Sequence, residues 1–213
     1  MNINEQNKEI IMSSSVILCQ KLMRGHLTRK RLLSTKDNMS LERLNKLLDA
    51  YNYFYTVKEE INEDFSENKK HKKIRNINFP SEISENLVKF YKFKQTGIMG
   101  TWNTDVGDIQ IQEKRCEVKG FMSDGPSSFG PDEKWDWIYF VDCKDFLNKH
   151  FQIYEIKLSN SSEMWKQLKV SKTQTFYDQC VEKRRPRLTF KEIQSQLPEE
   201  CKLIFSGPIS HLF

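Results

Sequence analysis

The segment from Gly107 to Gly120 places two acidic side chains and one basic side chain at a spacing suited to phosphodiester chemistry. Asp108, Glu117 and Lys119 lie in a stretch where polar and apolar residues alternate. Two neighbouring carboxylates can hold Mg²⁺, a hard cation that prefers oxygen ligands. A lysine beside them can orient an attacking water or offset charge that develops on a phosphate. We therefore take these three as candidate catalytic residues, with Asp108 and Glu117 as the metal ligands.

A β-hairpin would position these groups, because side chains along a strand alternate between its two faces. With a two-residue turn at Glu113 and Lys114, Asp108 would lie opposite Lys119. The polar face would carry Asp108, Gln110, Glu117 and Lys119, and the reverse face would carry Ile109, Ile111, Cys116 and Val118. Glu-Lys is not a favoured hairpin turn, so this register is a hypothesis.

Helices precede the hairpin and strands follow it. Apolar residues at three- and four-residue steps predict a helix over residues 40–55, with Ser40 as its N-cap. A further helix is expected to open at Pro80 and to be ended by Gly97 and Gly100. Strands are expected at 108–112, 115–121, 137–142, 152–158 and 203–205, and a mainly helical stretch at 162–177. This order predicts an α/β (α+β) fold, a mixed β-sheet flanked by helices.

The chain is expected to have three parts. Residues 1–56 form an N-terminal helical extension, 57–79 a charged linker or loop, and 80–213 the domain that contains the hairpin. The linker holds a dense run of basic residues at 69–75, which is read either as a solvated spacer or as an arm that contacts phosphates.

Composition limits the classes of function. The 34 basic and 29 acidic residues give a net charge of +5, which fits a polyanionic partner without proving one. The five cysteines include no CxxC pair, which argues against a disulfide framework and a zinc ribbon. No stretch approaches the roughly 20 apolar residues of a membrane span. We expect no membrane association and an intracellular, reducing compartment, the cytoplasm or nucleus.

The hairpin resembles the catalytic motif of the PD-(D/E)XK nuclease superfamily, and more narrowly that of type II restriction endonucleases. In these enzymes a helix precedes a hairpin that carries an aspartate, followed by Glu-x-Lys. Asp108, Glu117 and Lys119 match these positions, and Gly107 stands where proline is usual. The stretches 119–121, 125–131 and 135–140 also look like such endonucleases, and the resemblance covers roughly residues 80–213.

The resemblance implies a restriction-endonuclease-like fold and Mg²⁺-dependent, site-specific cleavage of double-stranded DNA, usually by a homodimer. Asp105 is a rival for the first acid. Glu82 or Glu85 on the preceding helix could add a metal contact, as in some family members.

Two segments could contact DNA. The loop at 123–134 follows Lys119 closely, and its small residues Ser127 and Ser128 would let the backbone approach a ligand. A basic cluster near the C-terminus can neutralise phosphates or bind a guanine edge; it consists of Lys183, Arg184, Arg185 and Arg187. An ordinary surface turn and a solvated loop are the competing interpretations.

Residues 17–32 resemble an IQ motif, a basic amphipathic helix that binds calmodulin-like proteins. The matching positions are Gln20, Arg24, Gly25 and Arg29, whereas Cys19 replaces the usual apolar anchor. The same helix could instead contact phosphates or pack on the nuclease domain. Such a helix on a nuclease would suggest a eukaryotic or viral setting.

Three functions remain open from the sequence. The first is a Mg²⁺-dependent, site-specific DNA endonuclease. The second is a DNA-binding or regulatory protein that keeps the fold without activity. The third is a nuclease that selects DNA structure, such as a junction or an end.

Overall fold

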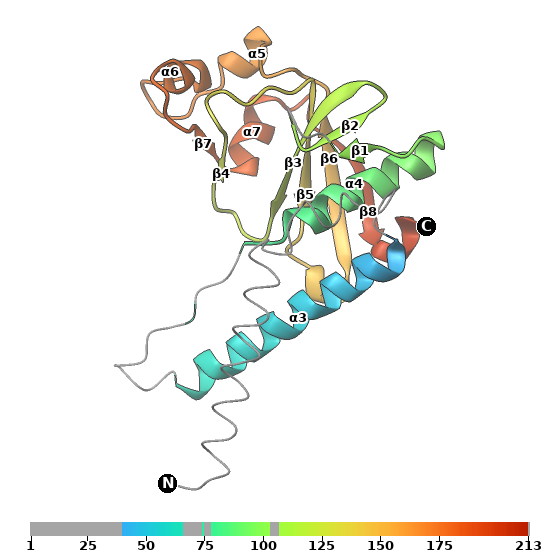
Figure 1. Cartoon of the computed structure of the whole chain (residues 1–213). Helices are drawn as coiled ribbons and strands as arrows, with labels where there is room; N and C mark the ends of the chain where they lie inside the picture. The colour runs from blue at the N-terminus through green and yellow to red at the C-terminus, as the bar shows by residue number, and fades with distance from the viewer. Residues whose placement is uncertain (1–39, 66–73, 75–77, 103–106, 213) are drawn as a thin grey trace, which may run out of the picture. The chain divides into compact units, whose positions relative to one another are not determined.

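Six strands form one mixed sheet, and helices cover its two faces (Figure 1). The computed structural model describes residues 40–65, 74, 78–102 and 107–212. The chain divides into two units, Met1–Asn78 and Phe79–Phe213. The second unit contains the sheet, so the predicted fold class, a mixed sheet flanked by helices, is confirmed.

The sheet has the strand order β1-β2-β3-β5-β6-β8, in which β3 and β5 are parallel and all other neighbours are antiparallel. Its strands are β1 (Thr101–Trp102), β2 (Ile109–Ile111), β3 (Lys114–Phe121), β5 (Trp137–Asp142), β6 (His150–Ile156) and β8 (Lys202–Pro208). A second, two-stranded sheet pairs β4 (Ser127–Ser128) with β7 (Arg187–Leu188). The helices of this unit are α4 (Ser81–Thr96), α5 (Glu163–Lys166), α6 (Phe176–Val181) and α7 (Phe190–Gln196), with 3-10 turns η1 (Phe146–Asn148) and η2 (Ile209–Leu212).

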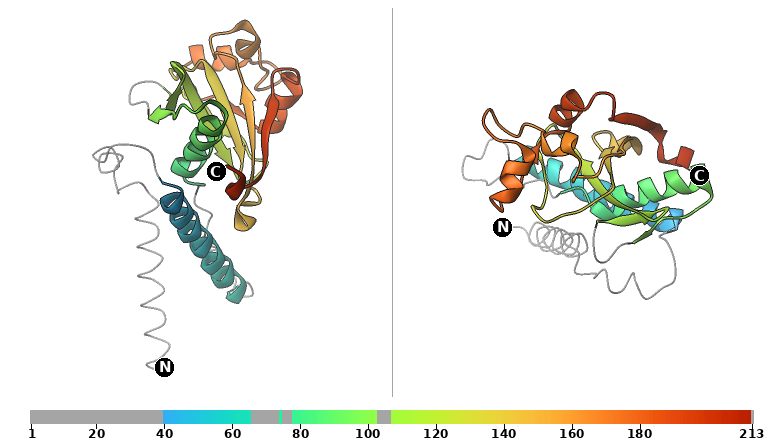
Figure 2. Two further views of the ribbon diagram at one scale, coloured as in Figure 1. Left: turned by 90° about the vertical axis from the view of Figure 1, so that its right-hand side faces the viewer. Right: turned by 90° about the horizontal axis from the view of Figure 1, so that it is seen from above.

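Helix α4 lies along one face of the sheet (Figures 1 and 2). It begins after Pro80 and ends at Gly97, as expected from the sequence. Gly97 has a φ of 71°, a left-handed conformation that glycine adopts without a steric penalty. The helix approaches β3 closely at Gly120, where an added Cβ would lie 3.0 Å from the Ser84 side chain. The backbone of β3 is therefore held tightly against α4.

A second core lies on the opposite face and joins the sheet to α5, α6 and α7. Ile138 and Phe140 of β5 contribute to it from the sheet. An aromatic cluster fills its centre, with ring centroids 5.4 Å apart for Trp135 and Trp165 and 5.6 Å apart for Phe129 and Phe176. Burying each large apolar side chain contributes about 1.5–3 kcal/mol, so this cluster fixes the loop that leads from β4 to β5.

The stretch predicted to be mainly helical at 162–177 is helical only at its two ends, in α5 and the start of α6. Helix α5 ends at Lys166, and α6 begins after Thr175. Between them the chain doubles back, and the Phe176 amide donates to the Leu168 carbonyl at 2.7 Å. Thr175 and Asp178 form a capping box that starts α6. Leu168 and Phe176 are both buried in the core.

The first unit contains α3 (Leu41–Asp64), which begins after Ser40 as predicted. The Ser40 hydroxyl accepts a hydrogen bond from the Arg43 amide at 3.3 Å. The helix continues nine residues past the expected end at Tyr55, since residues 56–64 contain neither glycine nor proline. The boundaries of the three predicted parts remain predictions, and residues 17–32 lie outside the described residues. No helix in the described part of the chain is long and apolar enough to cross a membrane.

Candidate active site on the β2–β3 hairpin

The hairpin turns one residue earlier than the sequence indicated. Ile109 pairs with Cys116 and Ile111 with Lys114, so Gln112 and Glu113 form the turn. Their φ angles are 50° and 64°, and positive φ at both central residues matches the twist of the flanking strands. The prediction that Asp108 lies opposite Lys119 is therefore wrong. Neither turn residue is glycine or asparagine, so the sequence did not mark this position.

The change of register does not alter which side chains of the hairpin share a face. Ile109, Ile111, Cys116 and Val118 are all buried. Val118 and Gly120 share one face of β3, and Gly120 touches α4. Glu117 and Lys119 alternate with them and therefore face the opposite side. The apolar face of the hairpin is packed in the core, and the acidic and basic groups share the other face.

Asp108 is fixed beside Glu117 by two hydrogen bonds. Its amide donates to the Cys116 carbonyl at 3.0 Å, and its Oδ2 accepts from the Val118 amide at 2.9 Å. Gly107 before it has a φ of 78°, and an added Cβ would lie 3.1 Å from the Cys116 carbonyl oxygen. Proline fixes φ near −65° and could not occupy this position. The glycine is therefore required by this backbone path.

The Glu117 carboxyl is buried, with 4% of the residue exposed. Its pKa is raised to about 7, chiefly by burial; the ion pair with Lys119 lowers the pKa, and the nearby charge of Asp108 raises it. A buried carboxyl next to a second carboxylate is costly to ionise without additional positive charge. This pair is therefore suited to binding a cation.

Lys119 supplies one positive charge to this site. Its Nζ donates a hydrogen bond to Glu117 Oε1 and lies 5.6 Å from the centroid of the Phe129 ring. Burial lowers the pKa of Lys119, but the combined attraction of Glu117, Glu133 and Asp108 outweighs burial and raises the pKa overall. Lys119 is thus a cation held against Glu117.

Glu133 is a third acidic residue near the site, and the sequence reasoning did not single it out. Its Oε2 lies 3.9 Å from Lys119 Nζ, and its Oε1 lies 3.7 Å from Arg185 Nη2. The only sequence signal was its place in the loop at 123–134 that follows Lys119. The contact depends on the fold of that loop, which local patterns do not specify.

Asp108 and Glu117 form the candidate metal site. Among the residues that the structure describes, no group of three or more His, Cys, Asp or Glu side chains is arranged to hold a metal ion. Asp108 and Glu117 lie together, whereas Asp105 falls outside the described residues. Glu82 and Glu85 lie on α4, which packs against the face of β3 opposite to Glu117.

The two segments predicted to contact DNA are brought together in the β4–β7 sheet. Ser128 pairs with Arg187 and Ser127 with Leu188. Arg185 Nε also donates to Ser128 Oγ at 3.1 Å. Leu188 is buried in the core and Arg187 is exposed. The outer face of this small sheet therefore carries Ser128, Arg185 and Arg187.

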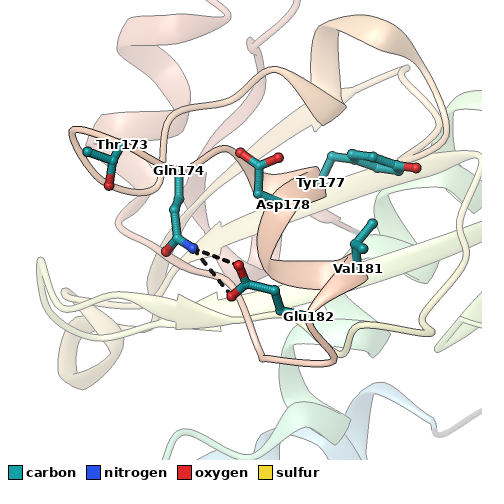
Figure 3. Close-up of a pocket in the computed structure, with 6 residues that line it drawn as sticks. All are labelled: Thr173, Gln174, Tyr177, Asp178, Val181 and Glu182. Atoms are coloured by element: carbon teal, nitrogen blue, oxygen red, sulfur yellow. Dashed lines mark hydrogen bonds between the residues drawn. The ribbon is translucent and has the colours of Figure 1, made fainter.

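The other two basic residues of the cluster have local acidic partners. Lys183 Nζ lies 2.7 Å from Asp132 Oδ1, and Arg184 forms an ion pair with Glu182. Arg184 Nη2 also donates to Gln174 Oε1 at 2.7 Å. Gln174 and Glu182 line a pocket on α6 (Figure 3), where Gln174 Nε2 donates to the Glu182 carboxylate. In the structure, Arg185 and Arg187 therefore point outward, whereas Lys183 and Arg184 pair with acidic residues.

The mixed sheet and its flanking helices have a restriction-endonuclease-like fold. The model of the Bsp6I restriction endonuclease family matches residues 39–196. The chain therefore belongs to the Bsp6I restriction endonuclease family. Among curated proteins it is similar to the type II restriction enzyme Bsp6I of Bacillus sp. (strain RFL6), with 28% identity over 123 residues. That match covers 54% of this chain and 64% of the enzyme. No solved structure matches the chain.

Proposed function

We propose that the chain is a Mg²⁺-dependent, site-specific endonuclease that hydrolyses phosphodiester bonds of double-stranded DNA. The observation that carries this proposal is the β2–β3 hairpin, which holds Asp108, Glu117 and Lys119 on one face and anchors Asp108 to the Val118 amide. Membership of a restriction endonuclease family supports the reaction class. A PD-(D/E)XK site is part of the proposal.

The residues at the hairpin fit a magnesium ion. Mg²⁺ is usually bound through one or two carboxylates, with water and substrate phosphates completing its coordination. Asp108 and Glu117 provide two carboxylates, and the raised pKa of Glu117 comes chiefly from its burial, with the Asp108 charge adding to it. When bound, the ion would polarise a phosphoryl oxygen and lower the pKa of a water. Asp108 and Glu117 would hold it.

Lys119 is the candidate for orienting the attacking water. Its Nζ is confined by Glu117 on one side and by the Phe129 ring on the other. Because it stays protonated, it can donate hydrogen bonds to water and offset negative charge on the scissile phosphate. Alanine at this position would remove both contributions.

The surface beside this site fits a DNA backbone. Arg185, Arg187 and Ser128 share the outer face of the β4–β7 sheet. Arginine can bind phosphate or a guanine edge bidentately. We propose that these groups, with Ser127, Lys183 and Arg184 around them, contact the duplex.

The test is cleavage of mixed duplex DNA with and without Mg²⁺ by the native protein and by Lys119→Ala. Discrete fragments that require both the metal and Lys119 are the expected result. Preferential cutting of junctions or ends would point instead to a structure-selective nuclease. If several DNAs are not cleaved with any of several metals but are still bound, the protein would be interpreted as an inactive DNA-binding protein of the same fold.

Two partner predictions accompany this proposal. A homodimer is expected from the resemblance to type II restriction endonucleases, and sedimentation of the protein with and without DNA tests it. Binding of a calmodulin-like protein is expected from the IQ-like residues 17–32 alone. Removing these residues and measuring binding to Ca²⁺-loaded and Ca²⁺-free calmodulin tests that expectation.

A further inference from the structure

Glu133 lies between the candidate catalytic lysine and the surface proposed to contact DNA. Its carboxylate is 3.9 Å from Lys119 Nζ through Oε2 and 3.7 Å from Arg185 Nη2 through Oε1. Oε2 is buried and has no hydrogen-bond partner among the described residues. Neither neighbouring cation is within hydrogen-bond distance, so this carboxylate is shared between them.

The local backbone is built to hold Glu133 in this place. The Asn160 side chain donates to the Glu133 carbonyl at 2.6 Å and accepts from the Trp135 amide at 3.4 Å. Gly130 leaves the space that the side chain fills, since an added Cβ would lie 2.7 Å from Glu133 Oε1. The carboxylate therefore reaches Lys119 because of the loop geometry and the missing side chain at position 130.

Lys119 needs a second acidic partner if Glu117 binds a cation. In the structure Lys119 Nζ donates a hydrogen bond to Glu117 Oε1. A cation bound by Glu117 would repel the lysine, because like charges at close range in a buried site interact strongly. Glu133 is the other carboxylate beside Lys119 Nζ that forms an ion pair with it. Glu133 can therefore hold the lysine side chain near the reacting phosphate.

Arg185 is the second cation beside the Glu133 carboxylate. It draws on the same carboxylate, and its Nε is bound to Ser128 on the outer face of the β4–β7 sheet. If Arg185 turns to a DNA phosphate or base edge, the Glu133 charge is left to Lys119 alone.

We infer that Glu133 is a positioning residue for Lys119, and that it links DNA contact by Arg185 to cleavage. The inference rests on the proposed endonuclease function. It requires that Glu133 affect the cleavage step and leave DNA affinity nearly unchanged.

The experiment compares Glu133→Gln with the native protein in two measurements. The first is the single-turnover cleavage rate at saturating DNA with Mg²⁺, and the second is the DNA dissociation constant without metal. We expect a rate lower by about 10- to 100-fold, the usual effect of removing a partner that orients a ligand or catalytic group. We expect the dissociation constant to change less than about twofold.

Three variants make this test specific. Glu163→Gln removes an exposed carboxylate that pairs with Lys166 on α5, and its cleavage rate should match the native rate. Gly130→Ala keeps the charge of Glu133 but displaces its carboxylate, and it should slow cleavage as Glu133→Gln does. Arg185→Ala should weaken DNA binding, and combining it with Glu133→Gln should lower the rate less than the product of the single effects.

The outcomes separate this inference from the proposed function. A native protein that cuts DNA, with an unchanged rate in Glu133→Gln, would overturn the inference and leave the endonuclease assignment intact. A parallel loss of rate and DNA affinity would also overturn it, because Glu133 would then be part of the binding surface. A native protein that never cuts DNA would refute the proposed function and this inference with it. Thermal unfolding of each variant confirms that it is folded.

Discussion

Replacing Asp136 by asparagine should loosen the strand that carries Glu117 and Lys119. Asp136 accepts hydrogen bonds from the Arg115 amide at 2.9 Å, from Arg115 Nε at 3.1 Å and from Arg115 Nη2 at 2.8 Å. Its own amide donates to the Arg115 carbonyl at 2.8 Å. These bonds join the start of β3 to the residue before β5. Asparagine keeps the shape but removes the charge and part of the acceptor capacity.

The magnitude follows from the pKa of Asp136, which its hydrogen bond to Arg115 lowers from 3.8 to about 2. This depression corresponds to roughly 2 kcal/mol of stability. Arg115 is 41% exposed, so screening by solvent reduces the effect to about 1–2 kcal/mol. Because the folded-state pKa is below the unfolded value, this stability is fully present well above pH 3.8. It is lost as pH falls toward 2, with about half gone at pH 3.

The assay is urea-induced unfolding of the native protein and Asp136→Asn at pH 7 and pH 3. The difference in unfolding free energy should be about 1–2 kcal/mol at pH 7 and should narrow at pH 3. Asp132→Asn is the control, because its exposed ion pair with Lys183 is worth less than about 0.5 kcal/mol. Equal effects of the two substitutions, or a difference that grows toward pH 3, would refute the reasoning.

Three further predictions test the packing and charges around the site. Gly120→Ala inserts a Cβ 3.0 Å from Ser84. Overpacking should lower the unfolding free energy by about 1–3 kcal/mol, as measured by denaturant unfolding. An unchanged denaturation midpoint would contradict the close approach of α4. Thr189→Ala removes the capping box with Glu192 at the start of α7 and should cost about 1 kcal/mol in the same assay, whereas Thr189→Ser should restore most of it. The pKa of Glu117 is raised to about 7 by burial, so in metal-free protein its ionisation opposes folding as pH rises from about 4.5 through 7. In EDTA, the unfolding free energy of Glu117→Gln should therefore exceed that of the native protein by an amount that grows from pH 5 to pH 8. A difference in unfolding free energy that does not depend on pH would argue against the burial effect.

Local patterns were sufficient to predict which hairpin side chains share a face. The alternation through Ile109, Ile111, Cys116 and Val118 fixes the buried face wherever the turn lies. The turn itself was misplaced because Gln112 and Glu113 adopt positive φ without being the residues that favour it. The pairing of Asp108 with Lys119 failed for that reason alone.

Contacts between distant segments could not be predicted from local patterns. The parallel pairing of β3 with β5 and the pairing of Ser128 with Arg187 join separate parts of the chain. The contact between Glu133 and Lys119 depends on both the loop and the aromatic cluster beneath it. Such contacts follow from the packing of the whole domain, which neither hydrophobic periodicity nor residue spacing encodes.

The residues proposed to contact DNA and the residues proposed to react lie on different sheets. Its two strands have two residues each, and only Leu188 anchors β7 in the core while Arg187 points outward. The hairpin with Asp108 and Glu117 belongs to the other, larger sheet. Exposed positions on the small sheet can therefore change without altering the geometry of the carboxylates. Under the proposed function, substitutions at exposed positions of this sheet other than Arg185, such as Arg187, would change the recognised DNA sequence while Asp108, Glu117 and Lys119 keep their places.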